Sequence, residues 1–284
     1  MKIAFLGPEG TFSEEALFTT IDRAQVEPVP LPTIYDCVIA VRDRQVERAF
    51  VPIENSLEGS VSATLDTLVF ETEAVEIVGE VVHPIQHSLV ARHAYKLETI
   101  TRVVSHPQAS AQCARFLRER LAQAKVVAAP STADAVKMVA GSDARWAALG
   151  TRLSADIYGC EVLLEGVEDH PDNETRFVWL EHREDQPAAR LGDRPSPVKT
   201  SIVFWGLPDA PGALLEILRE FAERRINLSK IESRPLKQGL GRYIFFADLE
   251  GSAVDETVGE ALSAVERRVG TLRILGSYPA ARTT

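Results

Sequence analysis

The hydroxyl group of Thr175 is the first candidate for chemistry in this sequence. It lies in DNETRF (172–177), where positions 173–175 match the N-glycosylation pattern and positions 177–180 are typical of a buried strand. Thr175 could therefore be part of a sugar signal, a strand-edge residue that makes one hydrogen bond, or a group that acts on a substrate. The start of the chain leads directly into a short strand-like run without the features of a secretory signal. We therefore expect a cytoplasmic protein, in which the glycosylation pattern is a chance match.

Three other segments carry polar side chains in a common order of strand, polar turn and helix start. They are GPEGTFSEEA (7–16), VPIENSLEGSV (51–61) and SHPQASAQC (105–113). In an open α/β sheet, ligands bind beyond the carboxyl ends of the strands, where helix N-termini present free N–H groups. If the three helix N-termini converge, their free N–H groups would bind an anion with little need for Arg or Lys.

Helix capping explains some of these side chains but not their number. In the first segment Thr11 is the expected cap, with Glu14 at capping-box spacing and Ser13 as the alternative. In the third segment the cap is Ser105 or His106, ahead of a proline at the first helical position. After the second segment, a helix is expected to start near position 58. The polar groups in excess of capping are Glu54, Asn55, Ser56, Gln108 and Gln112.

Other familiar chemistries fit the sequence poorly. It contains no GxGxxG, P-loop or GxSxG pattern, which removes the usual support for nucleotide binding and for a serine elbow. His83 and His87 are four residues apart, but Pro84 lies between them and no HExxH motif follows. We therefore expect no metal and no cofactor, and a chemistry that uses hydroxyls, amides, a carboxylate and one imidazole.

Length and composition indicate a globular protein of roughly two domains. The formal net charge of −10 gives no reason to expect binding to nucleic acid or to an anionic membrane. An anionic substrate must therefore be held by local backbone dipoles and a few placed side chains. The three cysteines, Cys37, Cys113 and Cys160, are widely separated and are expected to be reduced thiols.

The elements that must position these residues fall into two parts. Short strands alternate with helical segments through residues 1–182, which predicts an α/β fold with a mostly parallel sheet. Apolar positions 113, 116, 117 and 121 predict one helix with a buried face after His106. Residues 183–199 are charged and rich in proline, as in a linker. Residues 200–279 predict the order βαββαβ, a split βαβ unit.

The motifs taken together resemble those of a bacterial prephenate dehydratase. The resemblance rests on GPEGTFSEEA, VPIENSLEGSV, SHPQASAQC and NETRF, followed by an ACT-like unit with PGALLEIL and NLSKIESRP. It covers nearly the whole chain, and without a chorismate mutase segment the chain resembles the monofunctional form. The resemblance implies two α/β lobes of the type II periplasmic-binding-protein kind, with the active site in the cleft. The implied reaction converts prephenate to phenylpyruvate in phenylalanine biosynthesis, without cofactor or metal.

The resemblance also implies roles for site residues. Thr175 would donate a hydrogen bond, and potentially the proton, to the departing hydroxyl group, with Glu54 or His106 assisting. Arg176 would pair either with a substrate carboxylate or with a structural acid such as Asp172, and Phe177 is also expected in the core. The implied catalytic residues are Thr175, Glu54, Asn55, Ser105 and Gln112. The implied substrate-binding residues are Thr11, Phe12, Ser13, Ser56, His106, Gln108, Arg176 and Phe177.

The ACT-like unit is expected to sense L-phenylalanine in a homodimer or homotetramer. The residues matching the family's regulatory segments are Gly212, Ala213, Leu214, Asn227, Glu232, Ser233, Arg234 and Pro235. Three alternatives stay open. The substrate could be arogenate, the chain could be a non-catalytic two-lobed amino-acid-binding regulator, or it could be a structural oligomerisation protein, although the last leaves the excess of polar groups unexplained.

Overall fold

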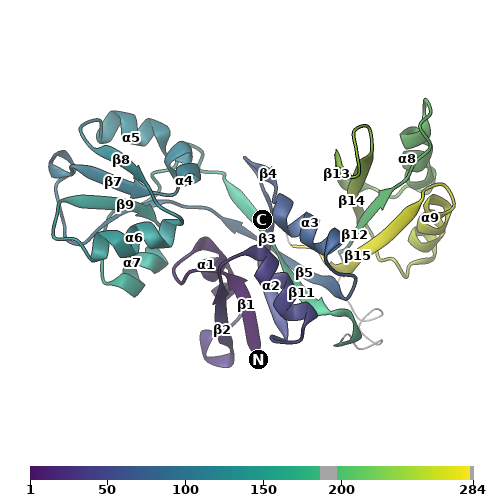
Figure 1. Ribbon diagram of the computed structural model, residues 1–284, viewed down its shortest axis with the longest axis horizontal. Coiled ribbons are helices and arrows are strands. Elements are labelled where there is room, and N and C mark those ends of the chain that lie inside the picture. Colours follow the sequence, from purple (N-terminus) through teal and green to yellow (C-terminus); the bar gives the residue numbers. More distant parts are fainter. Residues whose placement is uncertain (186–196, 282–284) are drawn as a thin grey trace. The chain divides into compact units, whose positions relative to one another are not determined.

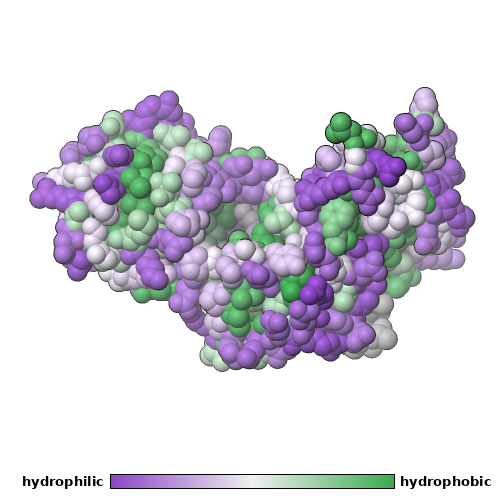
Figure 2. All heavy atoms as spheres, viewed as in Figure 1, coloured by the Kyte–Doolittle hydropathy of each residue, from purple (hydrophilic) through white to green (hydrophobic). Residues whose placement is uncertain are grey.

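The computed structural model describes residues 1–185 and 197–281. The chain divides into two compact units, Met1–Leu65 with Val82–Phe177, and Asp66–Val81 with Val178–Thr284. The face drawn in Figure 2 is mostly hydrophilic, with hydrophobic patches between the polar side chains. Within the described ranges, no helix has the length and apolar character needed to cross a membrane.

The first sheet holds the ends of several strands that matter for function. In the described chain it has six strands in the order β2-β1-β3-β11-β5, with β4 paired to β3 (Figure 1). β1 runs parallel to β2 and to β3, and the apolar run of β1 is fully buried at Ile3, Ala4 and Phe5. The strands are β1 (Lys2–Leu6), β2 (Glu27–Leu31), β3 (Arg48–Asn55), β4 (Gly59–Ser60), β5 (Val75–Pro84) and β11 (Glu174–His182). The helices of this part are α1 (Phe12–Phe18), α2 (Ile34–Arg42) and α3 (Ser62–Phe70).

The second sheet lies in the first unit and has the order β10-β6-β9-β7-β8. β7 is parallel to β8 and β9, whereas β6 is antiparallel to β9 and β10, so the sheet is mixed and not mostly parallel. Its strands are β6 (Ser88–Ala91), β7 (Arg102–Ser105), β8 (Lys125–Ala128), β9 (Trp146–Gly150) and β10 (Glu161–Leu164). Its helices are α4 (Pro107–Gln112), α5 (Ala114–Arg120), α6 (Thr132–Ala140) and α7 (Arg152–Tyr158). Short 3₁₀ helices occupy Arg23–Gln25, Leu97–Thr99 and Arg183–Asp185.

Helices cover both faces of this second sheet (Figure 1). Alternate residues of a strand point to opposite faces. Leu89 packs with Leu117 in one core cluster, whereas its neighbour Val90 packs with Val136 in another. The single helix expected after His106 is interrupted between α4 and α5, because Cys113 leaves the helical conformation with φ −115° and ψ 21°. Cys113 and Leu121 are nevertheless buried, as the apolar spacing predicts.

The second unit contains the expected βαββαβ order in a sheet β13-β14-β12-β15. All its pairings are antiparallel, and Ile217 and Phe221 of α8 pack with α9 over one face of the sheet. The elements are β12 (Val198–Trp205), α8 (Ala213–Glu223), β13 (Leu228–Pro235), β14 (Tyr243–Glu250), α9 (Glu256–Glu266) and β15 (Thr271–Pro279). β12 begins at Val198, two residues before the expected 200. The central part of the expected linker, residues 186–196, lies outside the described residues.

The same unit includes the second half of α3 and most of β5. Arg273 of β15 donates to the carbonyl oxygens of Val69 (2.7 Å), Leu68 (3.2 Å) and Thr72 (2.9 Å), at the end of α3. A Cβ atom at Gly276 would lie 2.1 Å from the carbonyl oxygen of Ile77 on β5. Position 276 therefore requires glycine, because any side chain would clash with that backbone.

Candidate active site

The first unit contains a cavity of about 400 Å³. Residues from the ends of β1, β3 and β7 line it, together with the segment ahead of α6 and two side chains of β11. The polar lining residues are Thr11, Ser13, Asn55, His87, His106, Gln108, Gln112, Ser131, Thr132 and Thr175. In the described chain, no Asp, Glu, Lys or Arg is among its lining residues.

Most of the expected site residues meet at this cavity. Thr11, Phe12, Ser13, Asn55, His106, Gln108, Gln112, Thr175 and Phe177 line it. The structure does not place Glu54, Ser56, Ser105 or Arg176 among the lining residues. Each of these four residues is next in sequence to a lining residue. Their hydrogen bonds and ion pairs therefore show whether they support the lining residues.

The loop after β1 is fixed by hydrogen bonds that differ from those of a capping box. Thr11 is the N-cap residue of α1 but makes no capping bond, because its hydroxyl donates to the carbonyl of Leu6 (2.9 Å). Glu14 does reach back, and its carboxylate accepts from the N–H of Gly10 (2.6 Å). Thr151, the N-cap residue of α7, donates to the carbonyl of Gly10 (2.9 Å). The loop that carries Thr11 is thus held by the end of β1 and by the N-cap residue of α7.

The end of β3 turns back before the next helix starts. Asn55 Oδ1 accepts from the N–H groups of Leu57 and Glu58, both at 3.0 Å. β4 then pairs with β3, with Asn55 opposite Gly59. The helix expected near position 58 therefore begins at Ser62. The prediction was wrong because residues 59–60 pair with β3 as a strand, and Gly59 has a φ of +79°, which a right-handed helix does not allow.

Thr175 lies at the start of β11 and is 7% exposed. Its Oγ1 accepts a hydrogen bond from Asn55 Nδ2 at 2.9 Å. Asn55 Nδ2 also donates to Asn173 Oδ1 (2.8 Å) and to the carbonyl of Glu174 (3.0 Å). The hydroxyl proton of Thr175 is not used in this contact, and no acceptor for it occurs within the described ranges.

Gln112 is held from the opposite side. Its Oε1 accepts from His87 Nε2 (2.9 Å) and from Asn173 Nδ2 (3.3 Å). His87 is 2% exposed, and its ring packs edge-on against Phe12 with centroids 5.1 Å apart. Burial lowers the pKa of His87, while the hydrogen bond that His87 donates to Gln112 and the charge of Glu168 act in the opposite direction. A neutral imidazole with its proton on Nε2 fits this contact, since Nδ1 is buried without a partner in the described chain.

The third segment forms the N-terminus of α4. His106 is the N-cap residue, and its Nδ1 accepts from the N–H of Gln108 at 3.3 Å, so His106 and not Ser105 is the cap. Ser105 is fully buried, and its hydroxyl donates to the carbonyl of His106 at 3.1 Å. Ser105 therefore supports the turn from behind the cavity lining.

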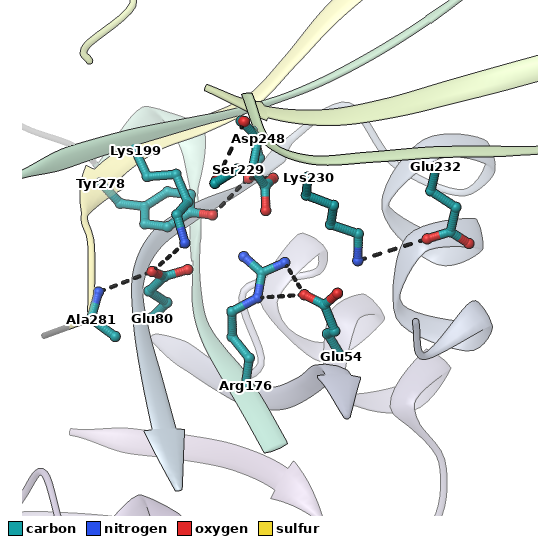
Figure 3. Close-up of polar contacts among 11 residues, drawn as sticks. Glu54, Glu80, Arg176, Lys199, Ser229, Lys230, Glu232, Asp248, Tyr278 and Ala281 are labelled. Carbon is teal, nitrogen blue, oxygen red and sulfur yellow. Dashed lines mark hydrogen bonds and ion pairs between the residues drawn. The ribbon is translucent and has the colours of Figure 1, made fainter. Parts of the chain in front are cut away.

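Arg176 was expected to pair with a substrate carboxylate or with a structural acid such as Asp172, and the structural acid that it pairs with is Glu54. Its Nη2 and Nε donate to Glu54 Oε2 at 2.8 and 3.1 Å (Figure 3). Alternate residues of a strand point to opposite faces of the sheet. Because Asn55 and Thr175 line the cavity, their neighbours Glu54 and Arg176 point away from it. Ser56 accepts from the N–H of Glu174 at 3.0 Å and so joins β3 to β11.

The sequence interpretation missed several residues of this site. Asn173 is fully buried and contacts both Asn55 and Gln112, yet it was considered only as part of a glycosylation pattern. His87 was considered only as a metal ligand. Ser131 and Thr132 line the cavity at the start of α6. Their signal was present, because residues 125–132 repeat the order of strand, polar turn and helix start. Within the described chain, no group of three His, Cys, Asp or Glu side chains could hold a metal ion.

The expected regulatory residues lie at two ends of the C-terminal unit. Gly212, with φ +86°, precedes α8, and Glu232, Ser233, Arg234 and Pro235 end β13. Asn227 precedes β13, at the other end of that strand, and donates to Glu250 Oε1 (2.8 Å). Arg234 pairs with Asp66 of α3 at 3.0 Å. The structure therefore does not bring Asn227 to the other segment residues.

Comparison with known proteins gives two family matches. Residues 3–185 match the family Prephenate dehydratase, and residues 200–267 match the ACT domain. A prephenate dehydratase of Mycobacterium sp. (strain JLS) is 42% identical over 288 residues, covering 98% of this chain and 89% of the relative.

Two solved structures resemble the whole chain. The crystal structure of prephenate dehydratase from Arthrobacter aurescens in complex with L-Phe has a TM-score of 0.88 and 39% identity, covering 98% of this chain and 90% of the other. GqqA, described as a novel type of quorum quenching acylase, has a TM-score of 0.84 and 29% identity, covering 99% and 98%.

Proposed function

The chain belongs to the prephenate dehydratase family, and from this premise we propose that its cavity converts prephenate to phenylpyruvate. The bond between the ring and its carboxylate breaks, and CO₂ leaves while its bonding electrons enter the ring. The bond between C4 and its hydroxyl group then gives up its electron pair to the leaving oxygen. One proton converts that oxygen to water, and the ring becomes aromatic.

The contact between Asn55 and Thr175 carries this proposal. Because Asn55 Nδ2 donates to Thr175 Oγ1 (2.9 Å), the hydroxyl of Thr175 is left to act as a donor in the cavity. A donor placed at the leaving oxygen stabilises the negative charge that develops there. Threonine is a weak acid, so its proton must be replaced as it is delivered.

His106 is our choice for the group that supplies this proton. It lines the cavity, whereas Glu54 is paired with Arg176 and is not among the lining residues. A neutral imidazole is too weak an acid to give up its only N–H proton, so the proton comes from the imidazolium form of His106. Loss of the proton returns the neutral ring, whose Nδ1 accepts from the N–H of Gln108 at 3.3 Å.

The composition of the cavity lining favours prephenate over arogenate. The described lining residues offer amides, hydroxyls and the N-terminus of α6, which suit carboxylates. They include no Asp or Glu to balance the ammonium group of arogenate. Buried charges are normally paired, so an unpaired ammonium would weaken binding.

For regulation, we propose that the ACT domain binds L-phenylalanine and inhibits the reaction. The family match over residues 200–267 and the L-Phe complex of the Arthrobacter aurescens relative support this. We also propose a cytoplasmic homodimer or homotetramer, since symmetric assembly is the usual setting for such control. Cys37 and Cys113 are free thiols buried in the core, which suits a reducing compartment.

The test is to incubate the purified protein with prephenate and, separately, with arogenate. We expect phenylpyruvate from prephenate, less of it when L-Phe is added, and much slower formation of phenylalanine from arogenate. Absence of product from both substrates would contradict the lyase function. A parallel incubation with an N-acyl amide tests for acylase activity like that described for GqqA. We expect none, since Thr175 Oγ1 accepts a hydrogen bond from the Asn55 amide, which cannot take up the hydroxyl proton as the general base of a nucleophile would.

A further inference from the structure

Asn173 connects two groups that the proposed reaction needs. Its side chain is fully buried between Asn55 and Gln112. Its Oδ1 accepts from Asn55 Nδ2 (2.8 Å) and from Ser56 Oγ (3.4 Å), and its Nδ2 donates to Gln112 Oε1 (3.3 Å). Its backbone carbonyl accepts from the N–H of Ile85 (2.8 Å), which fixes the position of the residue itself.

The contact with Gln112 determines which end of that carboxamide faces the cavity. Asn173 Nδ2 and His87 Nε2 both donate to Gln112 Oε1. If the amide of Gln112 were reversed, its NH₂ group would face two other donors, and both hydrogen bonds would be lost. The NH₂ group of Gln112, a residue of the cavity lining, is therefore directed away from Asn173 and His87 as a donor for the substrate.

The contact with Asn55 supports the direction of the hydrogen bond at Thr175. Asn55 Oδ1 accepts from two backbone N–H groups, and its Nδ2 faces Asn173 Oδ1 and Thr175 Oγ1. Asn173 Oδ1 acts together with these backbone N–H groups and with the carbonyl of Glu174 (3.0 Å) to keep the NH₂ group of Asn55 on that side. Thr175 then has to accept from Asn55, and its own proton stays available.

We infer that Asn173 is a positioning residue that orients Gln112 as a donor to the substrate and Asn55 as a donor to Thr175. One amide does both because its two ends are chemically opposite. A hydrogen-bonding side chain of similar size but with two acceptor ends cannot replace it. This inference rests on the proposed dehydratase function, because the two oriented groups act on prephenate.

Asn173→Asp is the sharpest test, since it keeps the size and the acceptor for Asn55 but removes the donor to Gln112. A buried acceptor then faces Gln112 Oε1, and the amide of Gln112 is driven to reverse. We expect kcat/KM for prephenate to fall by about 10- to 100-fold at neutral pH, as for loss of a buried hydrogen bond. At lower pH the carboxyl group introduced by Asn173→Asp takes up a proton and can donate again. Activity relative to wild type should therefore recover as the pH falls.

The pH profile separates positioning from a purely structural role. Gln123→Glu is the matched control, because Gln123 is an exposed amide that donates to the carbonyl of Leu97 (2.9 Å), away from the cavity lining. This control should keep wild-type kcat/KM at each pH. An Asn173→Asp protein with unchanged kcat/KM, or with a loss that does not depend on pH, would overturn the inference.

A second measurement covers the case in which Asn173→Asp does not fold. Asn173→Ser and Gln112→Ala are combined in a double-mutant cycle on kcat/KM. We expect the double variant to lose less than the sum of the two single losses, because Asn173 acts in part through Gln112. Additive losses would overturn the inference. Wild-type protein without prephenate turnover would contradict the proposed function and the inference with it, whereas normal wild-type turnover with an unaffected variant contradicts only the role of Asn173.

Discussion

The side chain of Thr175 has the same shape as that of valine except for its hydroxyl group, so Thr175→Val isolates that group. We expect Thr175→Val to fold normally and to lose about 10²- to 10⁴-fold in kcat, the usual contribution of a positioned proton donor. Thr175→Ser keeps the hydroxyl and should lose much less. Both variants are compared with wild type by initial rates of phenylpyruvate formation. Near-normal kcat in Thr175→Val would remove the hydroxyl from the mechanism.

His87 gives a prediction for stability against pH. Burial lowers the pKa of His87 below its usual value of 6.5. As the pH falls below 6.5, the unfolded chain binds a proton at this position that the folded protein resists, so the folded state loses stability. The slope for one group is at most about 1.4 kcal/mol per pH unit.

The measurement is chemical denaturation of wild type and of His87→Gln between neutral and acidic pH. His87→Gln retains an N–H donor for Gln112 but does not titrate. We expect the wild-type free energy of unfolding to fall more steeply on acidification than that of the variant. Parallel curves would show that His87 does not resist protonation in the folded protein.

At this scale the sequence predicted the types of the site residues better than their contacts. Thr175, Asn55 and Gln112 were expected together, and all three line the cavity. The role of Asn173 was not predictable, because the direction of an amide depends on partners from three distant segments. Arg176 could not be assigned to Glu54 from sequence, since the pair forms only when β3 and β11 are neighbours in the sheet.

The boundaries of elements were harder to predict than the elements. The interruption at Cys113 has no Pro or Gly to signal it, and the N–H of Cys113 still bonds to the carbonyl of Ala109 (3.1 Å). The start of α3 lies at Ser62 and not near position 58, because residues 59–60 pair with β3 as β4. Neither the conformation of Cys113 nor this strand pairing follows from helix propensity.

Arg273 allows a prediction about α3. The last carbonyls of a helix have no intrahelical partner, and Arg273 donates to three of the carbonyls at this end. Arg273→Met keeps much of the side-chain length but removes these donors. We expect a loss of about 2 kcal/mol in the free energy of unfolding and faster amide hydrogen exchange around residues 66–73. Unchanged exchange in that segment would mean that the helix end does not depend on Arg273.

At the scale of the whole molecule, α3 is one of three elements, with β5 and β11, in which the chain passes between the two units. It begins shortly after Asn55, and its residue Asp66 pairs with Arg234 (3.0 Å) and Lys237 (2.7 Å) in the second unit. Arg234 belongs to the segment expected to sense L-Phe. Binding of L-Phe at that segment would therefore change the ion pair between Arg234 and Asp66, and through it the position of α3.

Asp66→Asn tests this link, because it keeps the shape of the side chain and removes the charge that both cations share. We expect the concentration of L-Phe for half inhibition to rise by about 5-fold or more, in the range of allosteric couplings. Asp143→Asn, at an exposed pair with Arg92, is the control and should leave inhibition unchanged. Equal inhibition of Asp66→Asn and wild type would exclude this ion pair from the regulatory path.

The order of domains was the most predictable property of the molecule. The βαββαβ pattern of residues 200–279 is confirmed, because amphipathic helices and alternating strands are local signals. Strand direction was predicted less well. β6 and β10 are antiparallel to their neighbours, and nothing in a short apolar run such as Ser88–Ala91 specifies its direction.

The position of β11 in the first sheet also has a consequence for how the protein folds during translation. β11 lies between β3 and β5, yet the entire second sheet comes between β5 and β11 in the sequence. A chain growing on the ribosome therefore exposes β3 and β5 without their common neighbour while the second sheet is being made. Non-local pairings of this kind form late in folding. Asn173 and Thr175 arrive with that last strand, so completion of the first sheet and assembly of the catalytic groups are one event.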